Sequence, residues 1–516
     1  MNIGKDAIIK IVVDYIENNP ESILDLIFEY IEGESTCSLD FMKIISDYME
    51  KNPERVFNAL LNFIEKNPET NMKILITLAK SFVKREYDKK TVETIEDYFN
   101  RIPSLTDLME RITKEVDHEI VVRFFMNFVV NGVWKGGKLR DQFYKEKGGK
   151  VPFALLISPS MKCNLRCTGC YANDWDKAKC LTFEDVDRVV GEARDLGIHF
   201  MFVLGGEPYF VDFMWDIYEK YPDVEFFTFS NGTLFSEEFA DRILKLKNII
   251  PTFSLEGYKE DTDSRRGNGV YDKVMKGMDI LKARKIPFGV SSATGSPNID
   301  TVISEEFIQM CMDKGSFISW YFMFMPIGKP DTSLMLNPEQ RLRLGARTQE
   351  IRHTKPYLTI DFFNDSPYVG GCIAGSQYCH VTASGDVEPC VFAHFTVDNI
   401  KEKSLADVFA SDFFKALFKR QPYNKNLLKP CMMIDNPNVI RTVVKKVGAR
   451  PTDESAEAMI NDPKFMKELD DLSNNFTPYA DKVWEENYKD EHKNYIKRTQ
   501  FMDNWIAKEE NKAKDK

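Results

Sequence analysis

The chain carries three cysteines within one short segment, placed directly after a run of apolar residues. Cys163, Cys167 and Cys170 follow Phe153–Ile157, a run that begins after a proline and predicts a short buried strand. The three thiols are therefore expected on one loop at the exit of a strand. Cysteine thiolates are the usual ligands of four-iron clusters, and three of them leave one iron open for a small molecule. A zinc site needs four ligands, so the spacing favours a cluster over a zinc loop with a distant fourth ligand or three structural cysteines.

The spacing of Cys163, Cys167 and Cys170 resembles the signature of the radical S-adenosylmethionine (radical SAM) enzymes. The resemblance implies that the three thiolates hold a catalytic [4Fe-4S] cluster, whose open iron binds the amino and carboxylate groups of S-adenosylmethionine. It further implies that reductive cleavage of this cofactor yields a 5′-deoxyadenosyl radical, which abstracts hydrogen from an unactivated C–H bond. Many family members carry an aromatic residue just before the third cysteine. Here that position is Gly169, so Tyr171 is the expected aromatic cover over the cluster.

Composition and charge exclude several classes of protein. With 516 residues the chain has room for roughly two to four domains. Its net charge of −11 argues against a nucleic-acid partner. We find no apolar run of about 18 residues, which a transmembrane helix needs, and the charged residues 1–20 do not fit a secretory signal. A labile cluster, together with cysteines spread unlike a disulfide scaffold, predicts a reducing, cytoplasmic location.

Residues 1–150 predict an all-helical N-terminal domain. The motif Asn-Pro-Glu at 19–21, 52–54 and 67–69 suits helix starts, because Asn caps, Pro fits the first turn and Glu favours the positive end of the helix dipole. The apolar spacing after each motif favours a bundle of about four to six helices, with its role as dimer surface, partner dock or lid left open. The aromatic segment 123–130 is expected in the core rather than against a greasy substrate or a membrane. A loop-rich junction is predicted at the glycines 132, 136, 137, 148 and 149.

Residues 151–330 alternate apolar runs with helical patterns, which predicts an α/β fold with a parallel sheet and crossover helices. The expected strands are 153–157, 199–204, 225–229, 252–255, 288–292 and 319–325. Six such units build a partial (β/α)6, TIM-like barrel, in which the chemistry sits at the carboxyl ends of the strands. Every motif in this region follows a strand end, so all of them are expected on one rim.

Two of these strand ends carry the strongest cofactor signals. Gly205 and Gly206 let the backbone approach a ligand closely, and the carboxylate of Glu207 can accept from an ammonium group. Their place one βα unit after the cysteines matches the family segment that holds the methionine amino group. Ser230 and Asn231 end the third strand, where the resemblance implies a contact with ribose or with the methionine carboxylate. The alternative there is a plain turn.

The fourth strand end departs slightly from the family. Ser254 and Glu256 stand where many members have Ser-x-Asp-Gly. Arg266 has the place of an arginine that commonly pairs with the cofactor carboxylate, with Arg265 as the alternative. Pro326–Gly328 resembles the adenine-side turn. The resemblance thus implies nine cofactor-binding residues: Tyr171, Gly205, Gly206, Glu207, Ser230, Asn231, Ser254, Glu256 and Arg266.

Residues 331–450 contain a second cysteine group. A hairpin is predicted with its turn at 384–386, and Cys379 and Cys390 lie on its two arms, between Cys372 and Cys431. This segment resembles the SPASM or twitch extension of radical SAM enzymes, which implies one auxiliary iron–sulfur cluster held by Cys372, Cys390 and Cys431. Cys379 is either the fourth ligand or a small apolar residue in a strand. A four-cysteine zinc site is the alternative.

Residues 451–516 predict a charged helical tail that docks through Trp484 and Trp505. The substrate is not encoded in these motifs. A ribosomal peptide competes with a lipid or other small molecule, and a reducing partner such as ferredoxin or flavodoxin is expected. A non-catalytic electron-transfer protein is a third hypothesis, which the predicted amino-acid clamp at Glu207 argues against.

Overall fold

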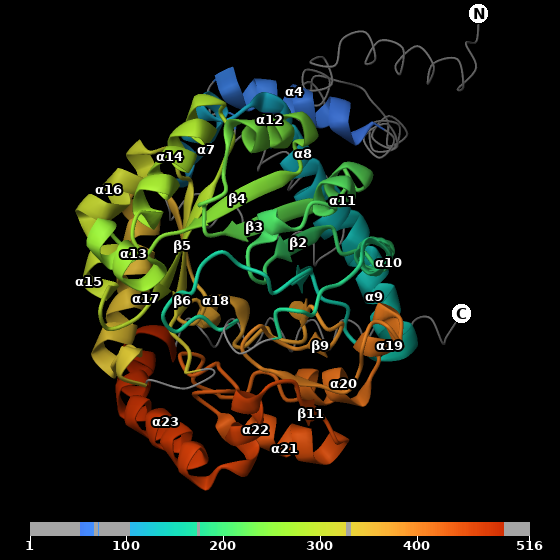
Figure 1. Ribbon diagram of the computed structural model, residues 1–516, viewed down its shortest axis with the longest axis vertical. Coiled ribbons are helices and arrows are strands. Elements are labelled where there is room, and N and C mark those ends of the chain that lie inside the picture. The colour runs from blue at the N-terminus through green and yellow to red at the C-terminus, as the bar shows by residue number, and fades with distance from the viewer. Residues whose placement is uncertain (1–51, 67–70, 72–103, 173–175, 327–331, 490–516) are drawn as a thin grey trace, which may run out of the picture.

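The computed structural model describes residues 52–66, 71, 104–172, 176–326 and 332–489, and Figure 1 shows their arrangement. One curved sheet of nine strands, in the order β7-β6-β5-β4-β3-β2-β1-β8-β9, forms its centre. Neighbouring strands are parallel except β8 and β9, which form the predicted hairpin. The crossover helices lie along the outside of the sheet, as expected for a partial barrel.

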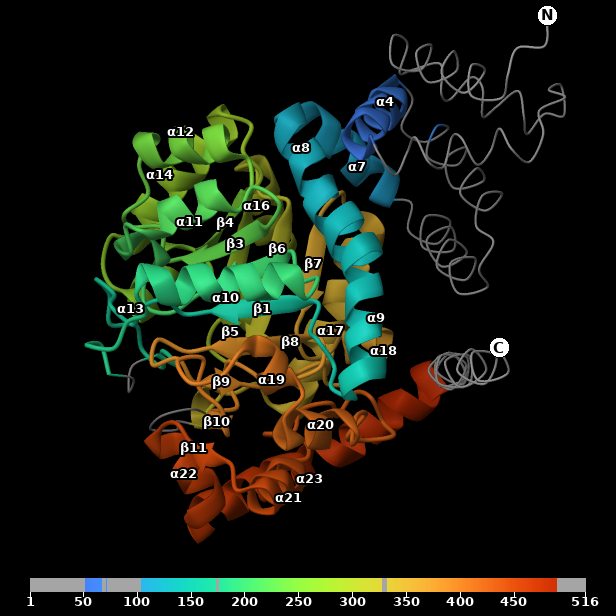
Figure 2. The ribbon, with the colours of Figure 1, turned by 90° about the vertical axis from the view of Figure 1, so that its right-hand side faces the viewer.

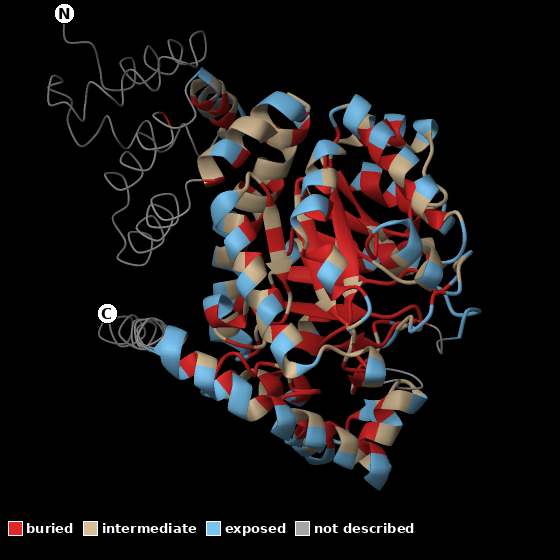
Figure 3. Cartoon of the chain, turned by 90° about the vertical axis from the view of Figure 1, so that its left-hand side faces the viewer, coloured by how far each residue is buried: buried red, intermediate tan, exposed pale blue. Residues whose placement is uncertain are grey.

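The first six strands coincide with the predicted ones to within three residues at each end. They are β1 Ala154–Ile157, β2 Phe200–Val203, β3 Glu225–Ser230, β4 Ile249–Ser254, β5 Gly289–Thr294 and β6 Ile318–Met323. Their side chains are buried almost throughout, which Figure 3 shows as a buried sheet behind helices with exposed outer faces. The α/β class and the partial barrel are therefore confirmed.

Three further strands join this sheet from beyond residue 330. They are β7 Leu358–Asp361, β8 Tyr378–Val381 and β9 Val387–Glu388. β7 extends the sheet next to β6, and β8 lies parallel to β1 with Leu156 opposite His380. The sheet thus crosses the predicted domain boundary at 330, and the auxiliary cysteine segment is built onto the edge of the barrel.

Side chains cap several of the crossover helices. Thr182 and Asp185 form a reciprocal capping box at the start of α10, and Ser236 caps α12. The helices between β1 and β7 are α10 Phe183–Asp195, α11 Met214–Lys220, α12 Glu237–Leu246, α13 Lys259–Arg266, α14 Val270–Ala283, α15 Ile299–Val302, α16 Glu305–Asp313 and α17 Pro338–Thr354.

The described N-terminal residues are helical, as predicted. The helices are α4 Pro53–Lys66, α7 Ser104–Glu115, α8 His118–Phe125, the π-helical stretch η1 Met126–Lys135 and α9 Gly136–Lys147. α4 begins after Asn52 as expected, whereas the motifs at 19–21 and 67–69 extend outside the described residues. In Figure 2, α8 and α9 run as one long rod beside the sheet.

The glycines in this rod correct one expectation. The predicted loop-rich junction is helical from 136 to 147, and Gly136 packs so closely on Gly197 that a Cβ would lie 2.3 Å from the Gly197 carbonyl oxygen. The missing side chain therefore permits close packing and does not break the helix. The aromatic segment packs in the core as expected, with the Phe128 ring 5.4 Å from those of Phe153 and Phe200.

The C-terminal region lies below the barrel in Figure 2. It contains α18 Ser366–Val369, β10 Phe395–Thr396, α19 Leu405–Phe409, α20 Asp412–Phe418, α21 Pro437–Val447, β11 Arg450–Pro451, α22 Glu454–Asn461, α23 Pro463–Val483 and η4 Trp484–Tyr488. Trp484 is buried against Leu427 and Leu428, as predicted for a docking residue, and Trp505 lies outside the described residues. In the described part of the chain, we find no helix whose length and hydropathy would let it span a bilayer.

Candidate active site

The three clustered cysteines lie on the loop that leaves β1. A turn brings Cys167 and Cys170 together, with the Cys170 amide donating to the Cys167 carbonyl at 3.3 Å. Burial raises the pKa of the Cys163 and Cys167 thiols, and the nearby Cys170 thiol adds to the rise in both. The effect of Cys170 on both of the other thiols indicates that these three free cysteines lie near one another.

The donor set at this loop fits an iron–sulfur cluster. All three donors are thiols, which are the ligands that such clusters use. Among the described residues, no three His, Cys, Asp or Glu side chains gather around a point that would hold a single metal ion. A polar group also faces the loop, because the Asn231 side-chain amide lies 3.6 Å from Cys163 Sγ.

Backbone hydrogen bonds attach the end of β2 to the cysteine loop. The Gly206 amide donates to the Ser160 carbonyl at 2.9 Å, and the Glu207 amide donates to the Lys162 carbonyl at 2.8 Å. A Cβ on Gly206 would lie 2.1 Å from the Lys162 oxygen, so no larger residue fits there. Glu207 is therefore hydrogen-bonded to Lys162, the residue directly before Cys163.

Glu207 is buried among the residues that the third strand end provides. Its carboxylate accepts hydrogen bonds from Ser230 Oγ at 2.7 Å, from the Asn231 amide at 2.8 Å and from the Tyr209 amide at 3.3 Å. Burial raises the pKa of Glu207 to about 7. A carboxyl group that ionises near neutral pH can accept a hydrogen bond from an ammonium group. The positive charge of that group would in turn stabilise the ionised carboxylate. The structure thus brings together Glu207, Ser230 and Asn231.

The fourth strand end forms a buried ion-pair cluster. Glu256 accepts from Arg265 Nη1 at 2.5 Å and from Arg266 Nε at 2.7 Å. Although burial alone opposes ionisation, the two arginines hold the pKa of Glu256 below its usual value. Arg266 Nη1 also lies 4.0 Å from Cys167 Sγ. Ser254 ends β4 beside Ser291.

Two aromatic side chains, Tyr171 and Phe324, lie beside the residues of this rim. The Tyr171 hydroxyl donates to the Gly205 carbonyl at 3.5 Å, and the thiols of Cys170 and Cys163 help burial to raise its pKa. Phe324, just after β6, packs under Gly169, where an added Cβ would lie 2.4 Å from its ring. Phe324 was not predicted from the sequence. Of the predicted turn at 326–328, Ile327 and Gly328 lie outside the described residues.

Three of the four cysteines between residues 372 and 431 lie near one another, with Cys390 buried and Cys372 and Cys431 partly buried. Burial, followed by the neighbouring Cys390 thiol, raises the pKa of Cys372 to about 12. The pKa of the Cys431 thiol is raised by burial, by the Asp435 carboxylate and by the Cys372 thiol. The Tyr378 hydroxyl donates to Cys390 Sγ at 2.9 Å. This second thiol group also fits an iron–sulfur centre.

Cys379 is separate from this group. It neighbours Tyr378 along β8, so its side chain points to the opposite face of the strand. Burial is the only cause that raises its pKa, in contrast to the mutual effects among the other three thiols. Its surroundings are those of a small apolar residue in a strand.

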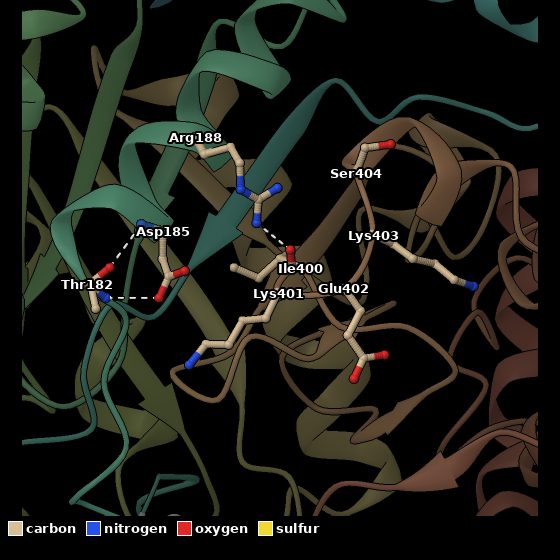
Figure 4. A pocket seen from close by; sticks show the side chains of 8 residues that line it. All are labelled: Thr182, Asp185, Arg188, Ile400, Lys401, Glu402, Lys403 and Ser404. Carbon is tan, nitrogen blue, oxygen red and sulfur yellow. Dashed lines mark hydrogen bonds between the residues drawn. The ribbon is translucent and has the colours of Figure 1, made fainter.

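Two cavities differ in their relation to the cysteine groups. A cavity of about 300 Å³ lies between the end of β6 and α23, and its walls include Phe324, Arg341, Asp435 and Phe476. The cavity therefore extends from Phe324, which packs on Gly169 of the first cysteine loop, to Asp435 in the loop of Cys431. A hollow of about 520 Å³ lies between the start of α10 and residues 400–404; Figure 4 shows its charged side chains, and none of the predicted site residues lines it.

Two protein-family models match the chain. The radical SAM superfamily matches residues 157–311, and an iron–sulfur cluster-binding domain, SPASM, matches residues 372–435. The first match begins at the end of β1 and contains the three clustered cysteines. The second begins at Cys372 and ends at Asp435.

Several curated proteins are similar over part of their length. An AdoMet-dependent heme synthase of Methanosarcina barkeri is 20% identical over 48% of this chain and 79% of its own length. The sporulation killing factor maturation protein SkfB of Bacillus subtilis is 24% identical over 50% of this chain and 65% of its own. A cysteine-type anaerobic sulfatase-maturating enzyme of Clostridium novyi is 24% identical over 51% and 80%.

Among solved structures, Streptococcus suis SuiB bound to S-adenosylmethionine is similar, with a TM-score of 0.48 and 18% identity over 58% of this chain and 76% of that one. Native anSMEcpe with bound AdoMet and Cp18Cys peptide has a TM-score of 0.45 and 18% identity over 62% and 99%.

Proposed function

The chain is a radical SAM enzyme with a SPASM-type iron–sulfur domain, and we propose that it removes a hydrogen atom from a side chain of a peptide substrate. In this family a bound [4Fe-4S] cluster reduces S-adenosylmethionine, and the 5′-deoxyadenosyl radical that results abstracts hydrogen from the substrate. The protein's own residues hold, orient and shield these groups.

The observation that carries the proposal is the convergence of thiols and carboxylate on one rim. Cys163, Cys167 and Cys170 would hold the cluster, and Glu207 would accept from the amino group of the cofactor. Backbone bonds at Gly206 and Glu207 fix the two parts relative to each other. A protein that only carries electrons needs no such clamp.

The remaining rim residues would complete the cofactor site. Ser230 and Asn231 order the Glu207 carboxylate through their hydrogen bonds. Glu256 holds Arg266 beside Cys167, where the guanidinium offers positive charge to a bound anion. Tyr171 and Phe324 would exclude water from the cluster.

We assign a single auxiliary iron–sulfur centre to Cys372, Cys390 and Cys431. The Cys390 thiol raises the pKa of Cys372, and the Cys372 thiol raises the pKa of Cys431, which indicates that the three thiols lie near one another. Cys379 is left out of this ligand set, since its side chain points away. When bound by these thiolates, such a centre would supply one-electron redox chemistry.

A peptide side chain suits the space between the two cysteine groups. The cavity of about 300 Å³ is at the lower end of ligand sites, and a single side chain fills such a volume better than an extended molecule. Two of the similar proteins are named for the maturation of a sporulation killing factor and of a sulfatase. We further propose a cytoplasmic location and a reducing protein partner such as ferredoxin or flavodoxin.

The first test is release of 5′-deoxyadenosine by the anaerobically reconstituted and reduced protein. We expect Cys167→Ala to abolish the release, and Cys379→Ala, which removes a buried thiol outside the proposed ligand set, to retain it. Release at the wild-type level from Cys167→Ala would reject the assignment of the cluster.

The substrate class is tested with extracts from cells grown in deuterated medium. We expect deuterium to enter 5′-deoxyadenosine when the peptide fraction is added. Transfer from the small-molecule or lipid fraction, and none from peptides, would replace the peptide proposal with the alternative.

A further inference from the structure

A chain of buried hydrogen bonds joins the two cysteine loops. Ser158 Oγ lies 2.8 Å from His380 Nε2, and His380 Nδ1 lies 3.0 Å from Glu388 Oε2. Thr452 Oγ1 donates to the other carboxylate oxygen of Glu388. Ser158, His380 and Glu388 have no exposed surface. None of these residues belongs to the site described above.

Strand pairing explains how these residues meet. β8 lies between β1 and β9, and the register places His380 opposite Leu156 on one side and Glu388 on the other. The ring reaches past the last residue of β1 to Ser158, whose amide donates to the Val381 carbonyl at 2.9 Å.

The two ring nitrogens of His380 have separate partners, Glu388 at Nδ1 and Ser158 at Nε2. Each partner therefore restrains one edge of the ring. Both nitrogens and both carboxylate oxygens have partners, and a fully satisfied buried network holds its members in one arrangement.

Each end of this chain leads to a proposed metal-binding loop. Ser158 begins the segment whose carbonyls at Ser160 and Lys162 receive the amides of Gly206 and Glu207. The position of Ser158 therefore sets how the loop of Cys163 faces Glu207. At the other end, Glu388 precedes Cys390 by two residues.

From this arrangement we propose that His380 is a positioning residue for the S-adenosylmethionine site. It ties the hairpin that carries Cys390 to the exit of β1, and so holds the cysteine loop at the spacing from Glu207 that the cofactor requires. The inference rests on the proposed function, because it assumes that cluster and cofactor occupy this rim. It adds a residue that contacts neither of them.

The test uses the full-length, anaerobically reconstituted protein. His380→Phe keeps a ring of similar size and removes both hydrogen bonds, whereas Ser158→Ala removes only the bond at the catalytic end. The matched control is Ser319→Ala, since Ser319 is also buried and its hydroxyl lies 2.8 Å from that of Tyr357, a residue outside both proposed cluster sites.

We expect His380→Phe to keep the iron content and the electron paramagnetic resonance (EPR) signal of the reduced cluster without cofactor. The KM for S-adenosylmethionine should rise about tenfold or more, and the spectral change that the cofactor induces should shrink. Ser158→Ala should show the same effects in smaller size, and Ser319→Ala should match the wild type.

A wild-type KM together with a wild-type spectral change in both variants would overturn the inference. If His380→Phe loses iron, the KM and the spectral change of Ser158→Ala alone decide whether the inference holds, because that variant leaves the His380 ring in place. Failure of the proposed function is distinguishable, since the wild-type protein would then release no 5′-deoxyadenosine.

Discussion

Replacing Arg341 with leucine tests how the Cys431 loop is held. Arg341 Nη1 and Nη2 donate to the two carboxylate oxygens of Asp435 at 2.7 and 2.9 Å, and Nη2 also donates to the Leu428 carbonyl at 3.1 Å. The guanidinium carbon lies 3.9 Å from the centre of the Phe476 ring. The side chains of Arg341 and Asp435 are 6% and 1% exposed, so water screens the pair little.

Arg341→Leu leaves a buried carboxylate without its partner. Removing one member of a buried ion pair costs about 3–5 kcal/mol, and the lost contact with Phe476 acts in the same direction. Because Asp435 also accepts from the Cys431 amide at 3.0 Å, the effect should fall on the loop of residues 431–436. A change of this size raises the local opening constant by about two to four powers of ten.

Amide hydrogen exchange on the reconstituted protein measures this opening residue by residue. Arg343→Leu is the control on the same helix, since its ion pair with Asp300 is 51% and 78% exposed and should contribute less than about 1 kcal/mol. We also expect Arg341→Leu to lose auxiliary iron. Equal exchange at Cys431 in the two variants would refute the argument.

Three further predictions follow from single residues. Gly206→Ala should abolish 5′-deoxyadenosine release while the fold persists in circular dichroism, because its Cβ would collide with the Lys162 carbonyl; retained release would contradict the packing argument. Burial raises the pKa of Glu225 to about 8 from an ordinary 4.5, so the folded carboxyl stays neutral where the unfolded one ionises. Stability in urea should therefore fall, by at most about 5 kcal/mol, as pH rises from 4.5 to 8, and Glu225→Gln should remove this fall; an unchanged slope in the variant would assign the pH dependence to other groups. Glu207, with its pKa near 7, should accept a hydrogen bond from the amino group of the cofactor better as pH rises from 6 to 8, because the ionised carboxylate is the stronger acceptor. The KM for S-adenosylmethionine should therefore drop across that range and become flat in Glu207→Gln; a flat wild-type profile would argue against this role.

The barrel strands could be predicted because each is a short apolar run between turn residues. β7 has only four residues, two of them polar, and carries no comparable signal. β8 was expected as a hairpin strand, yet its pairing with β1 joins segments far apart in the sequence, which local patterns do not encode. The helical glycines at 136 and 137 misled the prediction because their role depends on Gly197, a distant partner.

The rim residues were predictable for the same reason as the strands, since each directly follows one. His380 was missed although a signal existed: the hairpin turn at 384–386 sets a register that places His380 opposite Glu388. A histidine facing a glutamate inside a buried hairpin predicts a hydrogen-bonded pair. Arg341 and Asp435 had no such signal, because they lie on separate elements and meet only after the C-terminal region has packed.

The pairing of β8 with β1 has a consequence for biosynthesis. β1 emerges from the ribosome early, but one of its two neighbours is translated only after most of the barrel. Until then its edge offers unpaired amides and carbonyls to other nascent chains. Iron delivery to the loop after β1 should therefore follow completion of the polypeptide, and a chain cut between β7 and β8 should aggregate and not yield a working half.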